Sequence, residues 1–289
     1  EHFIGIVDAM NHFGGTGLWN EEDGFYYDQL HRPGETVAVR ARSVVGVIPL
    51  FAVEILDEAT VSRLPGFRKR LEWFIANRPD LARHISCGVL SSGGAARERL
   101  LAVPSRERLV RVLRYVLSES ELLSPYGVRS LSRAHREQPV VFEGHRVEYA
   151  PGDSPTGLFG GNSNWRGPVW FPLNYLLIES LQKYHHFYGD SLQVELPTGS
   201  GRYVNLDEVA RELSARLARL YLAPAGQPPV ALRHRPFFQD GEAHRRGLYL
   251  FYEYFHGDDG HGLGAEHQTG WTALLTRVLE DEAQHRRTR

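Results

Sequence analysis

One stretch of the sequence gathers two tryptophans, an arginine and several asparagines at the start of an expected helix. It runs from Gly160 to Tyr175 and reads GGNSNWRGPVWFPLNY. Sugars are bound by an apolar surface that stacks on the ring, together with fixed donors and acceptors for the hydroxyl groups. Arg166 can donate a forked pair of hydrogen bonds. Trp165, Arg166 and Trp170 are therefore candidate sugar-binding residues; the alternative is a core tryptophan pair with Arg166 in a structural ion pair.

A second candidate is a carboxylate surrounded by aromatic side chains. Glu253 has two aromatic residues directly on each side, at the end of a helix that we predict over residues 247–255. A carboxylate in such surroundings either pairs with a buried cation or takes part in acid–base chemistry. The residues alone leave both roles open for Glu253.

Acidic residues and histidines follow in the stretch 256–267. Asp258, Asp259 and the neighbouring histidines are of types that bind metals, but their spacing matches neither a calcium-binding helix–loop–helix nor a zinc site. We interpret the stretch as a solvated loop and expect neither a metal nor another cofactor. Cys87 is the only cysteine and is interpreted as a small core residue.

Two other loops carry polar and aromatic residues. Acids and aromatics interleave in residues 21–28, which read EEDGFYYD, and this mixture suits either a sugar-binding cleft or a plain acidic turn. Arg129 lies in an expected turn over residues 127–132, where it either points into a cleft or forms a structural ion pair.

Composition excludes several classes of partner. The chain has 289 residues, 42% hydrophobic content and a formal net charge of −2, so neither nucleic acid nor a membrane surface is expected to bind. No apolar run approaches the roughly 18 residues that cross a membrane, and no secretory signal opens the chain. We therefore expect a cytoplasmic location. Phosphate-binding loops, dinucleotide fingerprints, nucleophile elbows and zinc-protease helices are also missing from the sequence.

Apolar residues recur mainly at helical spacing, which predicts a single all-α domain over residues 1–289. The first expected helix begins without a start signal, so we expect the chain to be part of a longer protein. Strand pairs are expected only near 140–149 and 192–203. The other expected helices cover residues 43–58, 64–76, 105–120, 172–188, 205–222, 247–255 and 269–285.

Together these motifs resemble glycoside hydrolase family 63, which includes processing α-glucosidases, bacterial α-glucosidases and mannosylglycerate hydrolases. The resemblance rests on residues 164–175, on residues 24–28 and 127–132, and on Glu253-Tyr254 followed by residues 270–272, all in the same order as in that family. It spans nearly the whole chain. The C-terminal part also resembles the trehalases, which share the same type of barrel.

The resemblance implies an (α/α)6 toroid-type barrel and hydrolysis with inversion of the anomeric centre, without a cofactor. Glu253 would be the general base that activates water. The substrate would be an α-linked oligosaccharide or a small glucoside. The residues implied to contact it are Trp165, Arg166, Trp170, Asn174, Tyr175, Tyr27, Glu266 and His267.

The sequence departs from the family pattern at the general acid. That aspartate belongs to a Glu-x-Gly-x-Asp motif ahead of the Phe-Tyr-Tyr-Asp stretch, and no such motif occurs here. About eight expected helices also fall short of twelve, so we expect an incomplete barrel, its C-terminal part, whose partner is the N-terminal portion of the same enzyme. Asp28 is the fallback acid. The alternatives are a non-catalytic carbohydrate-binding or structural helical domain, and a scaffold whose loops do not converge.

Overall fold

The structure of the chain is a computed structural model that describes residues 1–12, 17–82, 85–89, 97–157, 165–223, 227–234 and 248–287. The predicted glycine- and asparagine-rich loop over residues 160–164 lies outside the described residues, as does the side chain of Cys87. Within the described residues, no helix is both long and apolar enough to cross a membrane.

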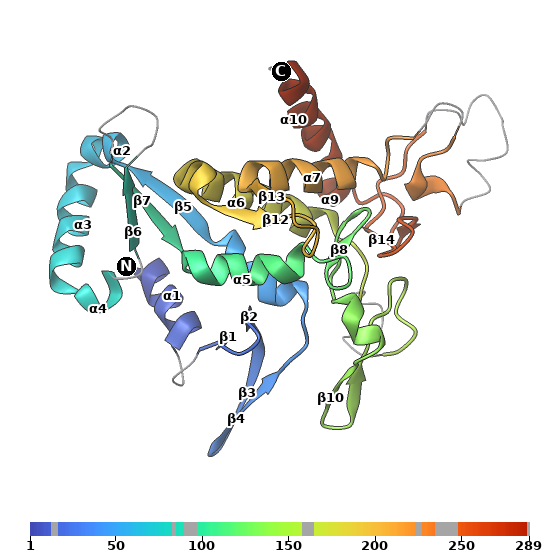
Figure 1. The fold of residues 1–289 in the computed structure, drawn as a ribbon, viewed down its shortest axis with the longest axis horizontal. Coiled ribbons are helices and arrows are strands. Elements are labelled where there is room, and N and C mark those ends of the chain that lie inside the picture. Colours follow the sequence, from blue (N-terminus) through green and yellow to red (C-terminus); the bar gives the residue numbers. More distant parts are fainter. Residues whose placement is uncertain are drawn as a thin grey trace.

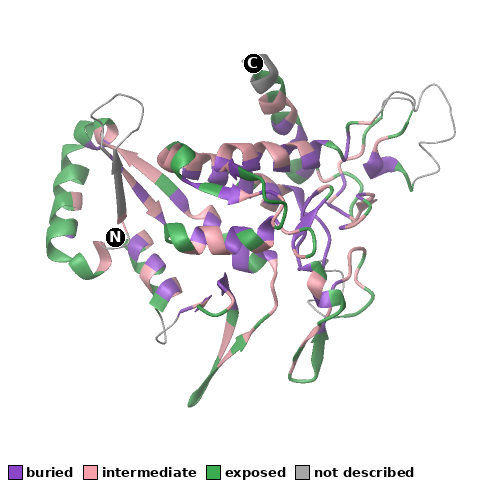
Figure 2. Ribbon diagram, viewed as in Figure 1, coloured by how far each residue is buried: buried purple, intermediate pink, exposed green. Residues whose placement is uncertain are grey.

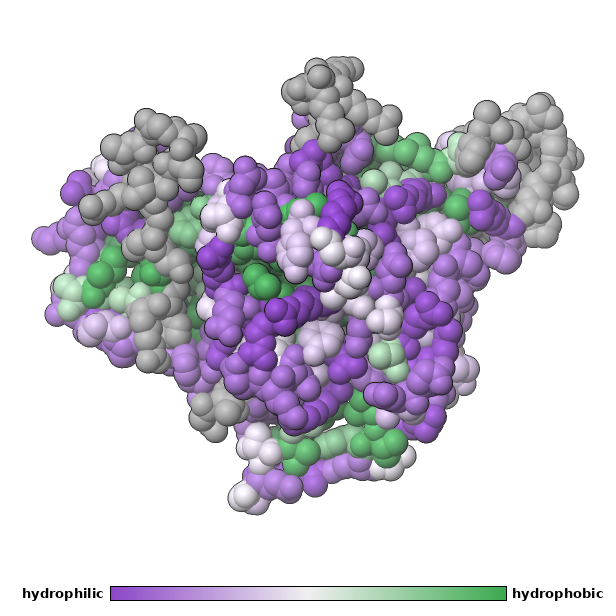
Figure 3. All heavy atoms as spheres, viewed as in Figure 1, coloured by the Kyte–Doolittle hydropathy of each residue, from purple (hydrophilic) through white to green (hydrophobic). Residues whose placement is uncertain are grey.

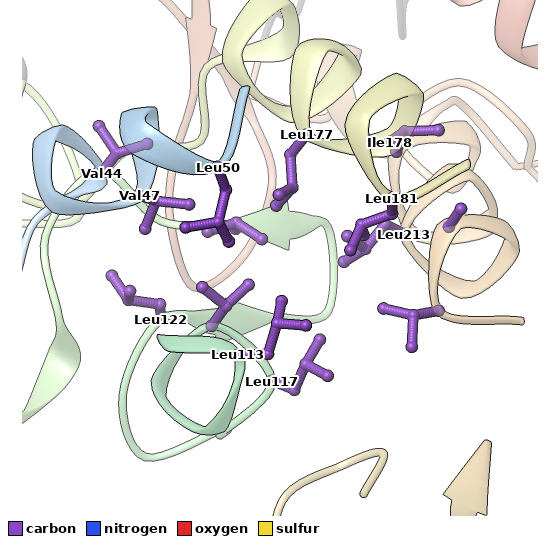
Figure 4. Close-up of a cluster of buried hydrophobic side chains, with 14 of the residues drawn as sticks. Val44, Val47, Leu50, Leu113, Leu117, Leu122, Leu177, Ile178, Leu181 and Leu213 are labelled. Carbon is purple, nitrogen blue, oxygen red and sulfur yellow. The ribbon is translucent and has the colours of Figure 1, made fainter. Parts of the chain in front are cut away.

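Two helices that pack against each other form the centre of the fold. They are α6 (Phe171–Tyr188) and α7 (Leu206–Ala218), and α5 (Arg106–Val116) and the 3-10 helix η2 (Val44–Phe51) complete the central layer (Figure 1). Leu50 of η2, Leu113 of α5 and Leu181 of α6 are fully buried where these elements meet (Figure 4). This cluster is the main apolar core. Burial of each such side chain stabilises the fold by about 1.5–3 kcal/mol.

Local capping signals set the ends of these helices. Ser105 accepts a hydrogen bond from the Arg108 N–H at the start of α5, and Asn205 does the same for Glu208 at the start of α7. At the other end of α6, Gly189 adopts φ +54°, a conformation that glycine tolerates best. The predicted helices over 105–120, 172–188 and 205–222 are confirmed, each with the expected cap.

Short antiparallel pairs surround this core. Among the described residues they form seven small sheets, six with two strands and one with three, in the order β5–β7–β6. Both strand pairs expected from the sequence, β10–β11 and β12–β13, are confirmed. The strands are β1 (Trp19–Asn20), β2 (Phe25–Tyr26), β3 (Asp28–Arg32), β4 (Glu35–Val39), β5 (Val53–Asp57), β6 (Ile85–Val89), β7 (Arg97–Ala102), β8 (Leu123–Ser124), β9 (Gly127–Val128), β10 (Val140–Phe142), β11 (His145–Val147), β12 (Gln193–Glu195), β13 (Tyr203–Asn205), β14 (Tyr254–Phe255) and β15 (Gly262–Leu263).

The remaining helices lie at the margins. Helices α1, α2, α3 and α4 gather beside the three-stranded sheet, and α10 extends from the opposite side of the α6–α7 pair (Figure 1). Most of α3 is exposed (Figure 2), and apolar surface shows at the same edge of the molecule (Figure 3). These elements are α1 (His2–His12), α2 (Glu58–Arg63), α3 (Pro65–Asn77), α4 (Pro79–Ala82), η3 (Arg133–Arg136), η4 (Gly189–Ser191), η5 (Val230–Leu232), α9 (Thr269–Thr272) and α10 (Leu275–Arg287).

The predicted all-α fold is wrong. The structure is a mixture of helices and seven small antiparallel sheets among the described residues, not an (α/α)6 toroid-type barrel or a plain part of one. Two expected helices account for much of the difference. Residues 43–58 form η2 and then β5, because Pro49 cannot continue a regular helix, and residues 248–255 form a loop that leads into β14.

Candidate functional site

Two segments that are far apart in the sequence lie side by side at the β14 end of the molecule. The Val169 N–H donates to the Phe255 carbonyl at 2.8 Å, and the Phe255 N–H donates back to Val169 at 2.9 Å. Val169 also forms a bridge to Arg129 on its other side. The tryptophan segment predicted from the sequence is therefore held directly against the segment that carries Glu253.

Aromatic side chains stack across this pair of segments. Trp165 lies parallel to Trp170 with ring centroids 4.3 Å apart, and Tyr254 stacks on Trp170 at 4.9 Å. Trp271 of α9 packs at a tilt against Trp170 at 5.4 Å. Trp170 is only 5% exposed, whereas Trp165 is partly exposed and Trp271 is 39% exposed. A sugar ring could therefore stack on Trp165 or Trp271, while Trp170 supports both from within.

Arg166 is buried beside this aromatic stack. Its Nη2 donates to the Ser154 hydroxyl at 2.5 Å, and its Nε has no hydrogen-bond partner although it is buried. A buried N–H without a partner costs free energy, so it is a natural donor for a ligand oxygen. Asp153, the residue directly before Ser154, accepts a hydrogen bond from the Tyr254 hydroxyl at 2.6 Å.

Glu253 is held by the turn that follows β15. Its carboxylate Oε2 accepts from the Ala265 N–H at 3.1 Å, and its own N–H donates to the Ala265 carbonyl at 3.0 Å. Gly264 makes this possible with φ +69°, since a Cβ there would lie 2.8 Å from the Glu253 Oε2 and 2.5 Å from the Tyr254 ring. Among the described residues, no hydrogen bond or ion pair engages the second carboxylate oxygen, and the residue is partly exposed.

The two predicted site residues on α6, Asn174 and Tyr175, are not part of the aromatic stack described above. Asn174 is buried, and its amide is used by the backbone: it accepts from the Val128 N–H at 2.6 Å and donates to the carbonyls of Val128 and Trp170, both at 3.0 Å. Asn174 therefore fixes β9 and the start of α6. Tyr175 is partly exposed one residue further on, and burial raises the pKa of its hydroxyl.

Tyr27 and Asp28 do not join this cluster. Tyr27 is buried in the core with its ring 5.4 Å from Phe25, and burial strongly raises its pKa. Asp28 is exposed on β3, which runs into a hairpin well separated from β14 (Figure 1). Partial desolvation raises the pKa of Asp28, as a general acid would need, but its position gives it no access to the segment around Glu253.

Two residues that the resemblance implies to contact the substrate, Glu266 and His267, lie at the protein surface. Glu266 and His267 are exposed in the connection between β15 and α9, and the His267 ring is 5.7 Å from that of Phe251. Glu266 directly follows Ala265, which holds the Glu253 carboxylate. The structure thus places both exposed residues directly after Ala265, the residue whose backbone pairs with Glu253.

Arg129 and Asp258 form the ion pair that underlies this region. Asp258 lies 3.2 Å from Arg129 and 2.9 Å from Arg136, and it accepts from the Tyr149 hydroxyl at 2.8 Å. Burial raises the pKa of Asp258, but these hydrogen bonds and charges outweigh burial and the pKa falls below its usual value. The structural alternative for Arg129 is therefore the one observed, and Asp258 is not part of a solvated loop.

Sequence reasoning missed three contributors to the site. Tyr254 serves as a stacking partner, and Asp153 and Ser154 anchor Tyr254 and Arg166. Tyr254 belongs to the aromatic cluster around Glu253 that the sequence analysis singled out, but its stacking on Trp170 depends on a distant segment. Nothing in the local sequence around Asp153 indicated its distant partner.

Comparison with known proteins supports the resemblance. The sequence model described as "Glycosyl hydrolase family 63 C-terminal domain" matches residues 98–197, which include the tryptophan segment but not Glu253. The predicted resemblance to family 63 is confirmed by this match. The chain is also similar to an uncharacterized protein of Saccharomyces cerevisiae, with 41% identity over 300 residues that cover 97% of the chain and 27% of that protein.

Two further relatives carry a functional name. The mannosyl-oligosaccharide glucosidase of Saccharomyces cerevisiae is 27% identical over 173 residues, and the probable mannosyl-oligosaccharide glucosidase of Schizosaccharomyces pombe is 25% identical over 174 residues. Each match covers 60% of this chain and 15% of the relative. The chain thus spans about a quarter or less of the curated relatives it matches, and the matches support a glycosidase-like function.

Proposed function

We propose that this chain supplies the water-activating half of an inverting α-glycosidase of the glucosidase type. Its substrates would be α-linked oligosaccharides or small glucosides. Glu253 is the general base, Trp165 and Trp271 stack on the sugar, and Arg166 donates to its hydroxyl groups. Asn174 positions these residues through its hydrogen bonds to the backbone of Val128 and Trp170.

The observation that carries the proposal is the pairing of Val169 with Phe255. It sets Glu253-Tyr254 beside Trp165–Trp170, so that Tyr254 stacks on Trp170 one residue from the candidate base. An apolar platform, a buried cation with a donor that lacks a partner and a carboxylate with one oxygen outside the described hydrogen bonds therefore belong to two paired segments. The family 63 match over residues 98–197 supports the same assignment for the tryptophan segment.

Glu253 acts as a base through its free oxygen. The Ala265 N–H fixes one carboxylate oxygen, which leaves the other to accept a proton from water as that water attacks the anomeric carbon. Attack from the face opposite the leaving group inverts the anomeric centre. Gly264 leaves room for the carboxylate, because a Cβ there would lie only 2.8 Å from the Glu253 Oε2.

Inversion also needs an acid to protonate the departing oxygen. The two carboxyl groups of inverting glycosidases stand roughly 6.5–9.5 Å apart. Asp28 is unsuited to this role because of its place on β3. We propose that the acid comes from another part of the complete protein, consistent with the small share of each relative that this chain covers.

Product stereochemistry tests the proposal. The complete protein is incubated with α-linked glucose disaccharides, and the first sugar released is followed by proton NMR. Inverting hydrolysis releases the β-anomer of glucose first, and its later mutarotation gives the α-anomer. Release of the α-anomer first would refute the inverting mechanism. Sugar binding without any hydrolysis across pH would instead support the non-catalytic carbohydrate-binding alternative.

A further inference from the structure

Three potential metal ligands converge on the hairpin that carries Glu253. His234, Asp259 and His261 each offer one ligand atom, and these atoms all lie within 4.8 Å of one another. Two of them belong to the loop between β14 and β15, and His234 comes from the turn after η5. We propose that these residues form a binding site for a divalent transition metal, with Zn²⁺ as the best fit. The proposal does not depend on the glycosidase assignment.

The side chains are arranged for a shared cation. The Asp259 Oδ1 lies 2.5 Å from the His261 Nδ1, and the His234 ring packs edge-on against the His261 ring at 4.3 Å. Tetrahedral zinc with bonds of roughly 2.0–2.2 Å keeps neighbouring ligand atoms about 3.3 Å apart. The three ligand atoms lie within 4.8 Å of one another, so small changes of the side-chain torsion angles are enough to reach this spacing.

Asp259 and His234 each have ligand atoms that the hydrogen bonds of the described residues do not use. All bonds of the Asp259 carboxylate among the described residues go to Oδ1, so Oδ2 is open. His234 is exposed, and the described residues form no hydrogen bond with its ring. The neighbouring carboxylate, Asp258, is already engaged by Arg129 and Arg136, so Asp259 is the loop's available anionic ligand.

The loop that presents the ligands is braced on several sides. The His256 N–H donates to the His261 carbonyl at 2.9 Å, and the Gly260 N–H donates to the His256 carbonyl at 3.0 Å. Gly260 adopts φ +79° against the Tyr126 ring, where a Cβ would lie 2.8 Å from ring carbons. A braced loop keeps its ligands in place before the metal arrives, which lowers the entropic cost of binding.

The donor set selects the kind of metal. Two imidazole nitrogens and one carboxylate oxygen favour Zn²⁺ and its neighbours Co²⁺, Ni²⁺ and Cu²⁺, whereas Ca²⁺ and Mg²⁺ prefer oxygen ligands alone. Water completes the coordination at this exposed site. His256 stacks on His261 at 4.8 Å, and its Nδ1 accepts from the backbone N–H groups of Asp258 and Asp259, so it positions the loop rather than binding metal.

A bound metal would tie the turn after η5 to the β14–β15 hairpin. The hairpin pairs Tyr254 with Leu263 and Phe255 with Gly262, so its loop end binds the metal and its open end leads to Glu253 and Ala265. The metal would therefore stiffen the frame that holds Glu253 without touching the carboxylate itself. Its role is structural.

Metal binding to the complete protein tests the proposal. After treatment with a chelator and its removal, Zn²⁺ is titrated by calorimetry, and Co²⁺ is titrated by its visible absorption. We expect one Zn²⁺ to bind at this site in each protein molecule, and an excess of Ca²⁺ should not displace it. The His234→Ala and His261→Ala variants should each weaken Zn²⁺ binding by more than the roughly 10- to 100-fold that loss of an outer-shell partner costs. Asp259→Asn should also weaken it.

The control is His145→Ala, which removes an exposed histidine from β11 and should leave Zn²⁺ binding unchanged. Thermal unfolding adds a second measurement, because a ligand that binds only the native state raises its stability. Zn²⁺ should raise the Tm of the wild type and of His145→Ala, but not that of His261→Ala. Wild-type affinity in His234→Ala and His261→Ala, or no Zn²⁺ binding by the wild type, would overturn the proposal.

Discussion

Val169 and Phe255 exchange both of their backbone hydrogen bonds, at 2.8 and 2.9 Å, although 85 positions separate them in the sequence. This pairing joins the tryptophan segment to the candidate base and fixes the register between them. Trp170 consequently stacks on Tyr254, the residue directly after Glu253. The predictions below depend on this arrangement.

Replacing Trp165 should mainly weaken sugar binding, whereas replacing Trp170 should mainly lower stability. Trp165→Ala takes away an exposed stacking surface, so we expect sugar binding to weaken roughly tenfold with little change in stability. Trp170→Ala leaves a cavity beneath three aromatic rings and should lower the free energy of unfolding by about 3–5 kcal/mol. Sugar titration and denaturant unfolding of both variants separate the two effects. Equal destabilisation by both would contradict the division of roles.

Asn174 should be needed for stability rather than for sugar contact. Asn174→Ala removes the partner of the Val128 N–H, of the Val128 carbonyl and of the Trp170 carbonyl. We expect the free energy of unfolding to fall by about 2–3 kcal/mol. Denaturant unfolding measures this change. Unaltered stability together with lost sugar binding would instead make Asn174 a direct ligand.

Gly264 should control the position of the Glu253 carboxylate. Gly264→Ala forces a methyl group toward the Glu253 Oε2 and the Tyr254 ring, so kcat should fall at least about tenfold. Gly34→Ala is the matched control, because Gly34 has a similar φ of +81° but nothing within 4 Å of the added Cβ. Steady-state kinetics of the two variants compare the clash with backbone strain alone. Equal losses would show that strain, not the contact, matters.

His135 should make stability depend on pH. Burial lowers the pKa of its ring, which accepts from the Arg42 N–H and lies 2.9 Å from the Gln138 carbonyl. The unfolded chain, with a pKa of about 6.5, then binds protons more readily than the folded chain, so stability is full above that pH and declines as the pH falls toward the folded pKa.

The measurement for His135 is the free energy of unfolding at about pH 7 and about pH 5. His135→Gln should reduce its dependence on pH in that interval, whereas the exposed His145→Gln should not. An unchanged pH dependence in His135→Gln would show that other groups dominate.

The sequence predicted those parts of the fold that local interactions determine. Ser105 and Asn205 begin helices and Gly189 ends one, since caps act within a single turn. The all-α prediction failed because strands of two residues, such as β14 and β15, are too short to show an alternating apolar pattern in the sequence. The apolar residues of 248–255 have a spacing typical of a helix, but they form a loop that leads into β14, with Leu248 and Tyr249 exposed.

The same distinction, between local interactions and contacts of distant segments, applies to the site residues. Trp165, Arg166 and Trp170 share one short segment, and the bridge between Val169 and Phe255 joins that segment to the one that carries Glu253. Tyr27, which the resemblance places at the substrate, and Asp28, the fallback acid, lie elsewhere: Tyr27 is buried beside Phe25, and Asp28 is exposed on β3. The convergence of His234 on Asp259 and His261 has no signal in spacing, because His234 belongs to a separate turn.

The most direct test of the account is the kcat of Glu253→Gln in the complete protein. The amide keeps the size of the side chain but cannot accept a proton from water, so kcat should fall about 10²- to 10⁴-fold while sugar binding and Tm stay near wild type. The control is Glu280→Gln, an exposed carboxylate on α10 that pairs with Arg277, and it should keep full activity. A Glu253→Gln enzyme with wild-type kcat would contradict the assignment of Glu253 as the base.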